Sequence, residues 1–98
     1  MYGLSVTPDR VAQVERGEAV LRSIGVAGDL RVRHRGSEAR IEVAPEAIPL
    51  VRERRSTVGA RLLALGFRRV TIDLHGYRRG SQLVDGRPSL EVLAEHAS

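Results

Sequence analysis

Cysteine, lysine and tryptophan are all absent from this chain of 98 residues. Without cysteine the chain can form neither a disulfide framework nor a thiolate metal site, and it has no sulfur nucleophile. The three histidines, His34, His75 and His96, are scattered without the spacing of metal ligands, so we expect no metal site. Aromatic residues make up only 3% of the chain, which leaves little side-chain surface for stacking on nucleic-acid bases.

Long apolar runs and nucleotide-binding signatures are also missing. No run approaches the roughly 20 apolar residues of a membrane span, and the first residues lack the basic and apolar regions of a secretory signal. No complete P-loop or dinucleotide-binding fingerprint is present. We therefore expect a cytoplasmic protein that makes no membrane contact and holds no cofactor.

All 16 basic residues are arginines, and 12 acidic residues leave a net charge of +4. The surplus is uneven, because residues 1–49 carry seven arginines and seven acids, whereas residues 50–98 carry nine arginines and five acids. A pI near 10.9 permits binding to a polyanion without requiring it. With 42% hydrophobic and 29% charged residues, the chain has the composition of a folded protein with one small core.

The hydrophobic pattern predicts a single small α+β domain with the element order α-β-β-α-β. The expected elements are helices over residues 8–24 and 53–65, a short helical turn over 45–52, and strands over 30–35, 38–43 and 69–74. We expect the helices to pack on one face of a three-stranded sheet and to leave the other face polar and rich in arginine. Residues 1–82 would form this domain, and residues 83–98 a tail in which 89–96 suit a short helix.

The predicted hairpin carries the most informative pattern. Its strands alternate between apolar and polar residues, and Gly36-Ser37 between them suits a two-residue type II′ turn. That turn fixes the register of the two strands. The core face would then hold Leu30/Val43, Val32/Ile41 and His34/Ala39, and the polar face Arg31/Glu42, Arg33/Arg40 and Arg35/Glu38.

The charges on this polar face allow two interpretations. In the first, the face is a solvated surface, and two of its three cross-strand pairs join opposite charges, each worth about 0.2–1 kcal/mol. The pair of Arg33 and Arg40 does not fit, because like charges directly opposite one another are destabilising. In the second, a bound anion relieves that repulsion, and the planar fork of arginine suits a carboxylate or a phosphate. We favour the anion site.

A set of motifs extends from Tyr2-Gly3 to Ser81. It comprises Arg31-Val32-Arg33-His34, Ala39-Arg40-Ile41-Glu42-Val43, Pro45-Glu46-Ala47-Ile48-Pro49, Leu65-Gly66-Phe67, Val70-Thr71-Ile72-Asp73-Leu74 and Gly76-Tyr77-Arg78-Arg79-Gly80-Ser81. In their combination and spacing these motifs resemble the C-terminal domain of the LarE family. Members of that family are ATP-dependent sacrificial sulfur transferases that make the nickel-pincer nucleotide cofactor.

The resemblance implies that this chain corresponds to only one part of a LarE enzyme. Family members carry an N-terminal PP-loop pyrophosphatase domain that adenylates a pyridinium carboxylate, followed by a cysteine-bearing segment that donates sulfur. This chain begins just past the position of that cysteine, so we expect no catalytic residue in it and no activity alone. The resemblance assigns Arg31 and Arg33 to substrate phosphate or carboxylate, and Glu42 to an active-site acid that orients them. It also implies a homo-oligomer and a PP-loop pyrophosphatase partner, whether the chain is a natural split subunit or a fragment.

The sequence therefore favours a binding and assembly domain that takes a phosphorylated pyridinium or nucleotide-like anion. One alternative is a small basic nucleic-acid-binding module, because the element order and the high pI also suit RNA binders. The scarcity of aromatic residues and the lack of a Gly-x-x-Gly clamp argue against it. A second alternative is a pure oligomerisation domain whose arginines form only ion pairs.

Overall fold

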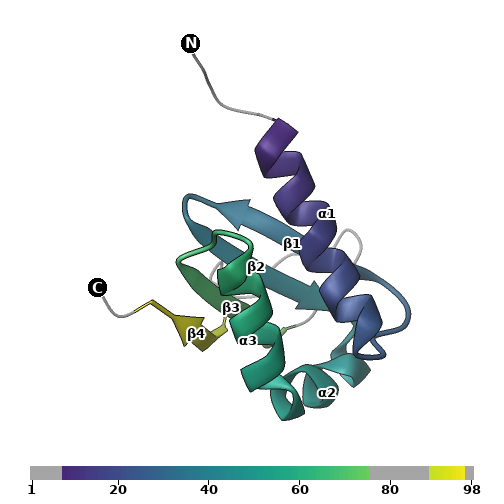
Figure 1. The fold of residues 1–98 in the computed structure, drawn as a ribbon. Coiled ribbons are helices and arrows are strands. Elements are labelled where there is room, and N and C mark those ends of the chain that lie inside the picture. The colour runs from purple at the N-terminus through teal and green to yellow at the C-terminus, as the bar shows by residue number, and fades with distance from the viewer. Residues whose placement is uncertain (1–7, 76–88, 97–98) are drawn as a thin grey trace.

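A 16-residue helix leads into a β-hairpin, and two further helices connect that hairpin to the rest of a mixed sheet (Figure 1). The computed structural model describes residues 8–75 and 89–96. Its elements are α1 (Pro8–Ser23), β1 (Leu30–Arg35), β2 (Glu38–Val43), the 3-10 turn η1 (Pro45–Ala47), α2 (Ile48–Glu53), α3 (Arg55–Ala64), β3 (Arg69–Asp73) and β4 (Leu90–Glu95). The α+β class is confirmed. Within the described ranges, no helix is both long enough and apolar enough to cross a membrane.

The four strands lie in the order β1-β2-β3-β4. The outer pairs, β1 with β2 and β3 with β4, are antiparallel, whereas β2 and β3 are parallel. A parallel pair needs a crossover connection rather than a tight turn, and here η1, α2 and α3 together provide it. The sheet is thus a hairpin and a crossover strand, with one more antiparallel strand at its far edge.

The hairpin register is confirmed residue by residue. Leu30 lies opposite Val43, and the register continues through Val32↔Ile41 to Arg35↔Glu38. At the turn, Gly36 has a φ of 62°, as a type II′ turn requires at its first central position. The two-residue turn therefore sets which side chains of both strands face the core.

The prediction of three strands is wrong, and so is the short helix over residues 89–96. Leu90–Glu95 form β4, whose register runs from Asp73↔Leu90 to Arg69↔Glu95 with an irregularity beside Val70. Leucine, alanine and glutamate are good helix formers, but the edge of β3 offers unpaired backbone groups that a helix there would leave unsatisfied. The proposed boundary at residue 82, the Gly76–Ser81 motif and the Tyr2-Gly3 pair lie outside the described residues.

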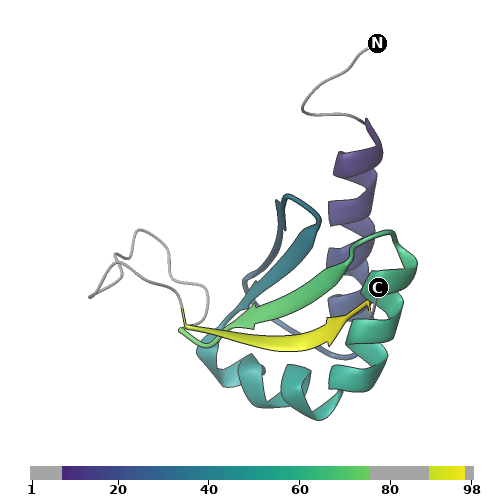
Figure 2. The same ribbon diagram turned by 90° about the vertical axis from the view of Figure 1, so that its left-hand side faces the viewer.

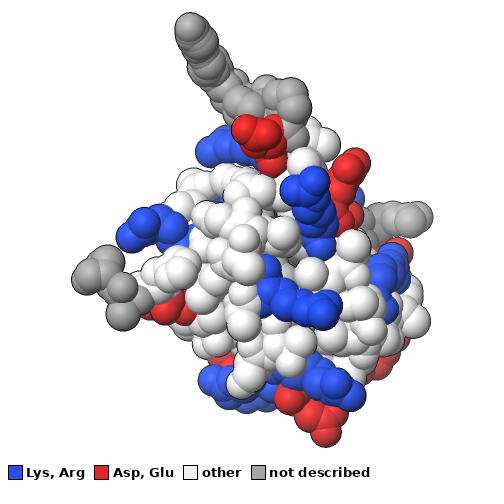
Figure 3. Space-filling view, in the orientation of Figure 1, with Lys and Arg blue, Asp and Glu red and all other residues white. Residues whose placement is uncertain are grey.

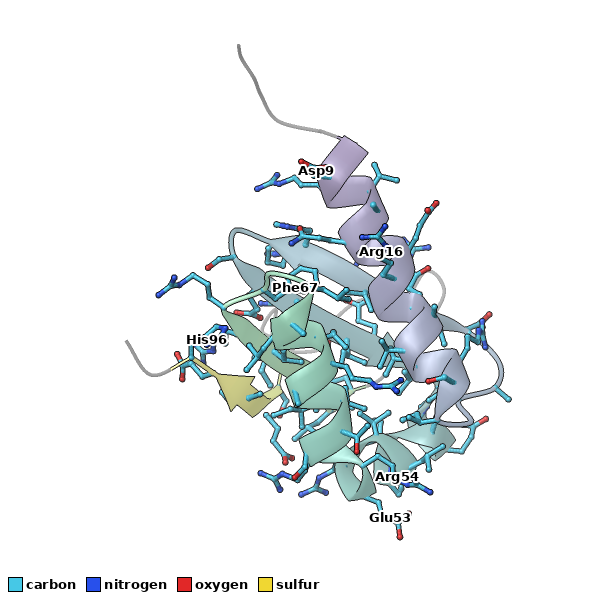
Figure 4. The ribbon with its side chains drawn as sticks, in the orientation of Figure 1. Asp9, Arg16, Glu53, Arg54, Phe67 and His96 are labelled. Atoms are coloured by element: carbon cyan, nitrogen blue, oxygen red, sulfur yellow. The ribbon has the colours of Figure 1, made fainter. Side chains whose placement is uncertain are left out.

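Helices α1 and α3 lie on the same face of the sheet, and α2 lies at one end of it (Figures 1 and 2). Asp9 sits in the first turn of α1 (Figure 4), where a carboxylate favours the positive end of the helix dipole. The side chains between helices and sheet are almost entirely buried: Leu21, Val26, Val32, Ala39, Ile41, Val43, Val51, Val58, Leu62, Phe67, Val70 and Ile72. The opposite face of the hairpin carries the charged residues of its strands, as predicted.

Two buried helical glycines differ in how closely they approach the sheet. A Cβ atom on Gly59 of α3 would lie 2.6 Å from the Cβ atom of Ala94 in β4. A Cβ atom on Gly17 of α1 would lie 3.5 Å from the nearest atoms of Val32, which is an ordinary contact. The absence of a side chain at Gly59 therefore lets α3 pack directly on β4.

We predict that Gly59→Ala destabilises the protein by about 1–3 kcal/mol, the usual cost of overpacking a core. Gly17→Ala is the matched control, because it makes the same change in a helix that has room for a methyl group. It should be neutral or stabilise by up to about 1 kcal/mol, as alanine does in helix interiors. Urea denaturation of both variants measures the difference. Equal effects of the two substitutions would show that the α3–β4 contact is not tight.

Candidate functional site

One sheet face, turned away from α1 and α3, gathers the charged residues that the sequence singled out. The register places Arg31, Arg33, Arg35, Glu38, Arg40 and Glu42 of the hairpin on it, together with Arg69, Thr71 and Asp73 of β3. We refer to this set as the polar sheet face. It brings all three predicted site residues, Arg31, Arg33 and Glu42, to one surface.

Arg33 and Glu42 form the best-aligned ion pair on the polar sheet face. The Nε atom of Arg33 donates to both carboxylate oxygens of Glu42, each at 3.0 Å. The side chain of Arg33 is 42% exposed, whereas that of Glu42 is 15% exposed. Glu42 lies directly opposite Arg31 in the register, and its carboxylate reaches diagonally to Arg33. Glu42 is thus half-buried and forms its ion pair with Arg33, although Arg31 is its direct neighbour in the register.

A second acid holds the arginine that lies opposite Arg33. The Nε atom of Arg40 is 3.4 Å from Oε2 of Glu38, which is two residues away on the same strand. The same oxygen accepts a hydrogen bond of 2.6 Å from the hydroxyl of Thr71. The sequence interpretation paired Glu38 with Arg35, and the structure joins it to Arg40 and Thr71 instead.

The repulsion between Arg33 and Arg40 is therefore offset within the protein. Each guanidinium presents its Nε atom to a carboxylate, so the like-charge pair does not by itself require a bound anion. Among the described residues, no hydrogen-bond acceptor engages the terminal Nη groups of either arginine. These amino groups, on one sheet face, are the donors that the site can offer to a ligand.

Asp73 has a structural role at the end of β3. Its Oδ1 atom accepts a hydrogen bond of 2.9 Å from the backbone N–H of His75, two residues further on. Its side chain lies on the polar sheet face, yet the residue is only 8% exposed. No arginine within residues 8–75 and 89–96 forms a salt bridge with it. This local bond stabilises the turn that ends the strand.

On the helix side of the sheet, His34 lies beside an open groove lined by Arg10, Val11, Val14 and Glu15 of α1. The amide of Gln13 donates from Nε2 to the carbonyl of Leu65 at 2.7 Å, which leaves its Oε1 atom 3.0 Å from Nε2 of His34. The neutral ring therefore carries its proton on Nε2. Its Nδ1 atom is buried and has no hydrogen-bond partner among the described residues. Phe67 packs against the ring, with the ring centroids 5.2 Å apart.

Burial lowers the pKa of His34 below its usual value, and the positive charge of Arg10 adds to the effect. Protonation would place a second N–H on the buried Nδ1 atom, where no group within residues 8–75 and 89–96 accepts it. Because the unfolded chain holds the proton more tightly, acidification favours unfolding. The contribution is complete above about pH 6.5 and is lost as the pH falls from there toward the lower pKa of the folded state.

We predict that the free energy of unfolding decreases as the pH is lowered from about 7.5 to about 5. His34→Gln should flatten this part of the profile. His96→Gln is the control, because His96 is exposed at the end of β4 (Figure 4), and it should keep the slope of the unmodified protein. Urea denaturation at several pH values measures both slopes. A His34→Gln profile as steep as that of the unmodified protein would contradict the assignment.

Comparison with known proteins shows what this chain is similar to. No protein-family profile matches the chain. The chain is 42% identical over 79 residues to pyridinium-3,5-bisthiocarboxylic acid mononucleotide synthase of Lactiplantibacillus plantarum. The aligned residues are 81% of this chain and 28% of that enzyme, so the chain spans little more than a quarter of its relative's length.

The similar region covers most of this domain, and the relative is a LarE enzyme. The level of identity is well above what a shared composition would produce, and it accompanies the motif set described for the hairpin and β3. We conclude that this chain is related to the LarE family over the 79 residues that align.

Proposed function

We propose that this chain acts in nickel-pincer cofactor synthesis, as the part of a LarE-like sulfur transferase that binds the anionic substrate. The ligand is a phosphorylated pyridinium or a nucleotide-like anion, held by Arg31 and Arg33 with Glu42 as their orienting acid. The observation that supports this most directly is the Arg33–Glu42 pair on the polar sheet face. It occurs in a chain that is 42% identical, over 79 residues, to pyridinium-3,5-bisthiocarboxylic acid mononucleotide synthase.

The geometry suits this class of ligand. A mononucleotide carries a phosphate, and the acid groups on a pyridinium ring are planar and negatively charged. Arginine binds both kinds of group through parallel N–H donors. Glu42 engages only the Nε atom of Arg33, so it restrains the side chain and leaves the Nη donors for the ligand. Fixing the side chain in advance lowers the entropy lost on binding.

Sulfur transfer needs chemistry that this sequence does not contain. The chain has no cysteine and no complete P-loop signature. A PP-loop pyrophosphatase, on the same longer polypeptide or on a separate one, supplies ATP activation, and a donor outside residues 1–98 supplies the sulfur. The proposed role of this domain is to bind the substrate anion and to assemble with that partner, as a homo-oligomer.

The helix face gives no support to a nucleic-acid-binding module. On the face formed by the helices, basic side chains stand as separate groups among uncharged atoms and acids (Figure 3). A nucleic-acid footprint is a basic patch or stripe that follows the phosphate backbone. On the polar sheet face, Arg33 and Arg40 lie in acid-held pairs, which suits a small anion.

We predict that Arg33→Ala weakens binding of pyridinium-3,5-dicarboxylate mononucleotide by about 1.5–3 kcal/mol, or about 10–150-fold in Kd. The variant should remain folded, because an exposed ion pair contributes at most about 1 kcal/mol and the substitution also removes a positive charge beside Arg40. Isothermal titration calorimetry measures the affinity, and a thermal melt the stability.

Arg16→Ala is the matched control, since Arg16 is exposed on α1 on the other side of the sheet (Figure 4). It should leave the affinity within about twofold. If Arg33→Ala lowers the stability of the protein but the molecules that remain folded bind the mononucleotide normally, Arg33 has a structural role and does not bind the ligand. A sub-micromolar affinity for one RNA at physiological salt, with a salt slope of about 0.7–0.9 per phosphate contact, would favour the nucleic-acid alternative.

We also predict that the isolated chain releases no pyrophosphate from ATP in the presence of magnesium and pyridinium-3,5-dicarboxylate mononucleotide. The reason is that residues 1–98 contain neither a PP-loop nor a cysteine. A coupled pyrophosphate assay measures this. Release of pyrophosphate by the purified chain would contradict the proposal that a separate PP-loop domain supplies ATP activation.

A further inference from the structure

A chain of polar contacts runs from the middle of the sheet to the arginine opposite Arg33. Thr71 of β3 is fully buried, and its hydroxyl donates to Oε2 of Glu38 at 2.6 Å. The same oxygen faces the Nε atom of Arg40 at 3.4 Å. In the parallel register, Thr71 is the direct neighbour of Arg40 on β3. One carboxylate oxygen therefore links a buried hydroxyl to a guanidinium on the polar sheet face.

This buried polar arrangement is less favourable in free energy than an apolar one, so a purely structural strand would not need it. A hydroxyl and a carboxylate taken out of water lose hydration that their mutual contact only partly replaces. Valine at position 71 would keep the shape and the strand preference without that cost. The side chain of Glu38 is 18% exposed and that of Arg40 is 16% exposed, so both are less exposed than Arg33, at 42%. The contacts restrain the position of the Arg40 guanidinium.

The two arginine–acid pairs match each other across the hairpin. Arg33 and Arg40 are directly opposite in the register, and each presents its Nε atom to an acid, Glu42 in one case and Glu38 in the other. No acceptor in the described part of the chain engages the Nη groups of either one. Two such guanidinium groups on neighbouring strands offer more N–H donors than the two oxygens of a carboxylate can use, and a phosphate has three terminal oxygens to accept them.

We propose that Arg40 is a further ligand for the phosphate of the bound anion, and that Glu38 and Thr71 are its positioning residues. This inference rests on the proposed function and deepens it. Arg40, together with Arg33, selects the phosphorylated form of the ligand over its dephosphorylated form. Thr71 acts indirectly, because its hydroxyl fixes the carboxylate of Glu38 beside the Nε atom of Arg40.

The test compares two probes, pyridinium-3,5-dicarboxylate mononucleotide and the corresponding nucleoside without phosphate. Arg40→Gln should weaken binding of the mononucleotide about 10–100-fold, the range of a charged hydrogen bond, and leave nucleoside binding within about twofold. Arg69→Gln is the matched control, because Arg69 is an exposed arginine on the same sheet face. It should change neither affinity by more than about twofold.

The positioning role has its own readout. Thr71→Val should weaken mononucleotide binding about 3–10-fold, less than Arg40→Gln does, because Thr71 acts on the ligand only through Glu38 and Arg40. Thr71→Ser restores the hydroxyl and should recover most of the affinity. A thermal melt checks that each variant is folded. If Thr71→Val and Thr71→Ser bind the mononucleotide alike, the hydroxyl does not position Arg40 and that part of the proposal is wrong.

The outcomes separate this proposal from the proposed function. If Arg33→Ala weakens mononucleotide binding and Arg40→Gln does not, Arg40 is structural and the substrate site stands without it. Equal losses for Arg40→Gln and Arg69→Gln would show general electrostatic attraction and would overturn the role of Arg40. If neither Arg33→Ala nor Arg40→Gln affects binding, the anion site itself is wrong.

Discussion

The two-residue turn at Gly36-Ser37 is the constraint on which the rest of this structure depends. Strand side chains alternate with a period of two, so a shift of one residue would move every side chain of the hairpin to the other face. With the turn in place, Val32 and Ile41 are buried under α1 and α3, and Arg33 and Arg40 meet on the opposite face. The core and the candidate site are thus two consequences of one register.

The hairpin could be predicted because the residues that determine it lie close together in the sequence. Turn chemistry and alternation lie within residues 30–43, and together they specify every paired residue. β4 could not be predicted in this way, since Leu90–Glu95 contain good helix formers and pair with β3 through contacts made only in the folded chain. Glu91 illustrates this, because its carboxylate lies 3.0 Å from Nε of Arg52 and 3.6 Å from Nη1 of Arg55, at the crossover helices.

The sequence could predict which charged residues share one sheet face, but it could not predict the contacts between them. The register placed Arg31, Arg33 and Glu42 together, but it could not show that Glu42 reaches diagonally to Arg33. The link between Glu38 and Thr71 required the parallel pairing of β2 and β3, which periodicity does not reveal. A useful signal was available, since Glu38 and Arg40 are two residues apart and share a face. The two faces also differ in chemistry, because the helix side holds the half-buried His34, whose pKa is lowered, and the polar side holds the acid-held arginines.

The central claim is that Arg31, Arg33 and Arg40, on the hairpin part of the polar sheet face, bind the anion. The most direct measurement is an NMR titration of the ¹⁵N-labelled chain with pyridinium-3,5-dicarboxylate mononucleotide, following backbone amides and arginine Nε–H signals. The account predicts saturable shifts at the Nε–H groups of Arg33 and Arg40 and at the amides of β1 and β2. Shifts confined to the arginines of α1 and α3, or no saturable shift at all, would contradict it.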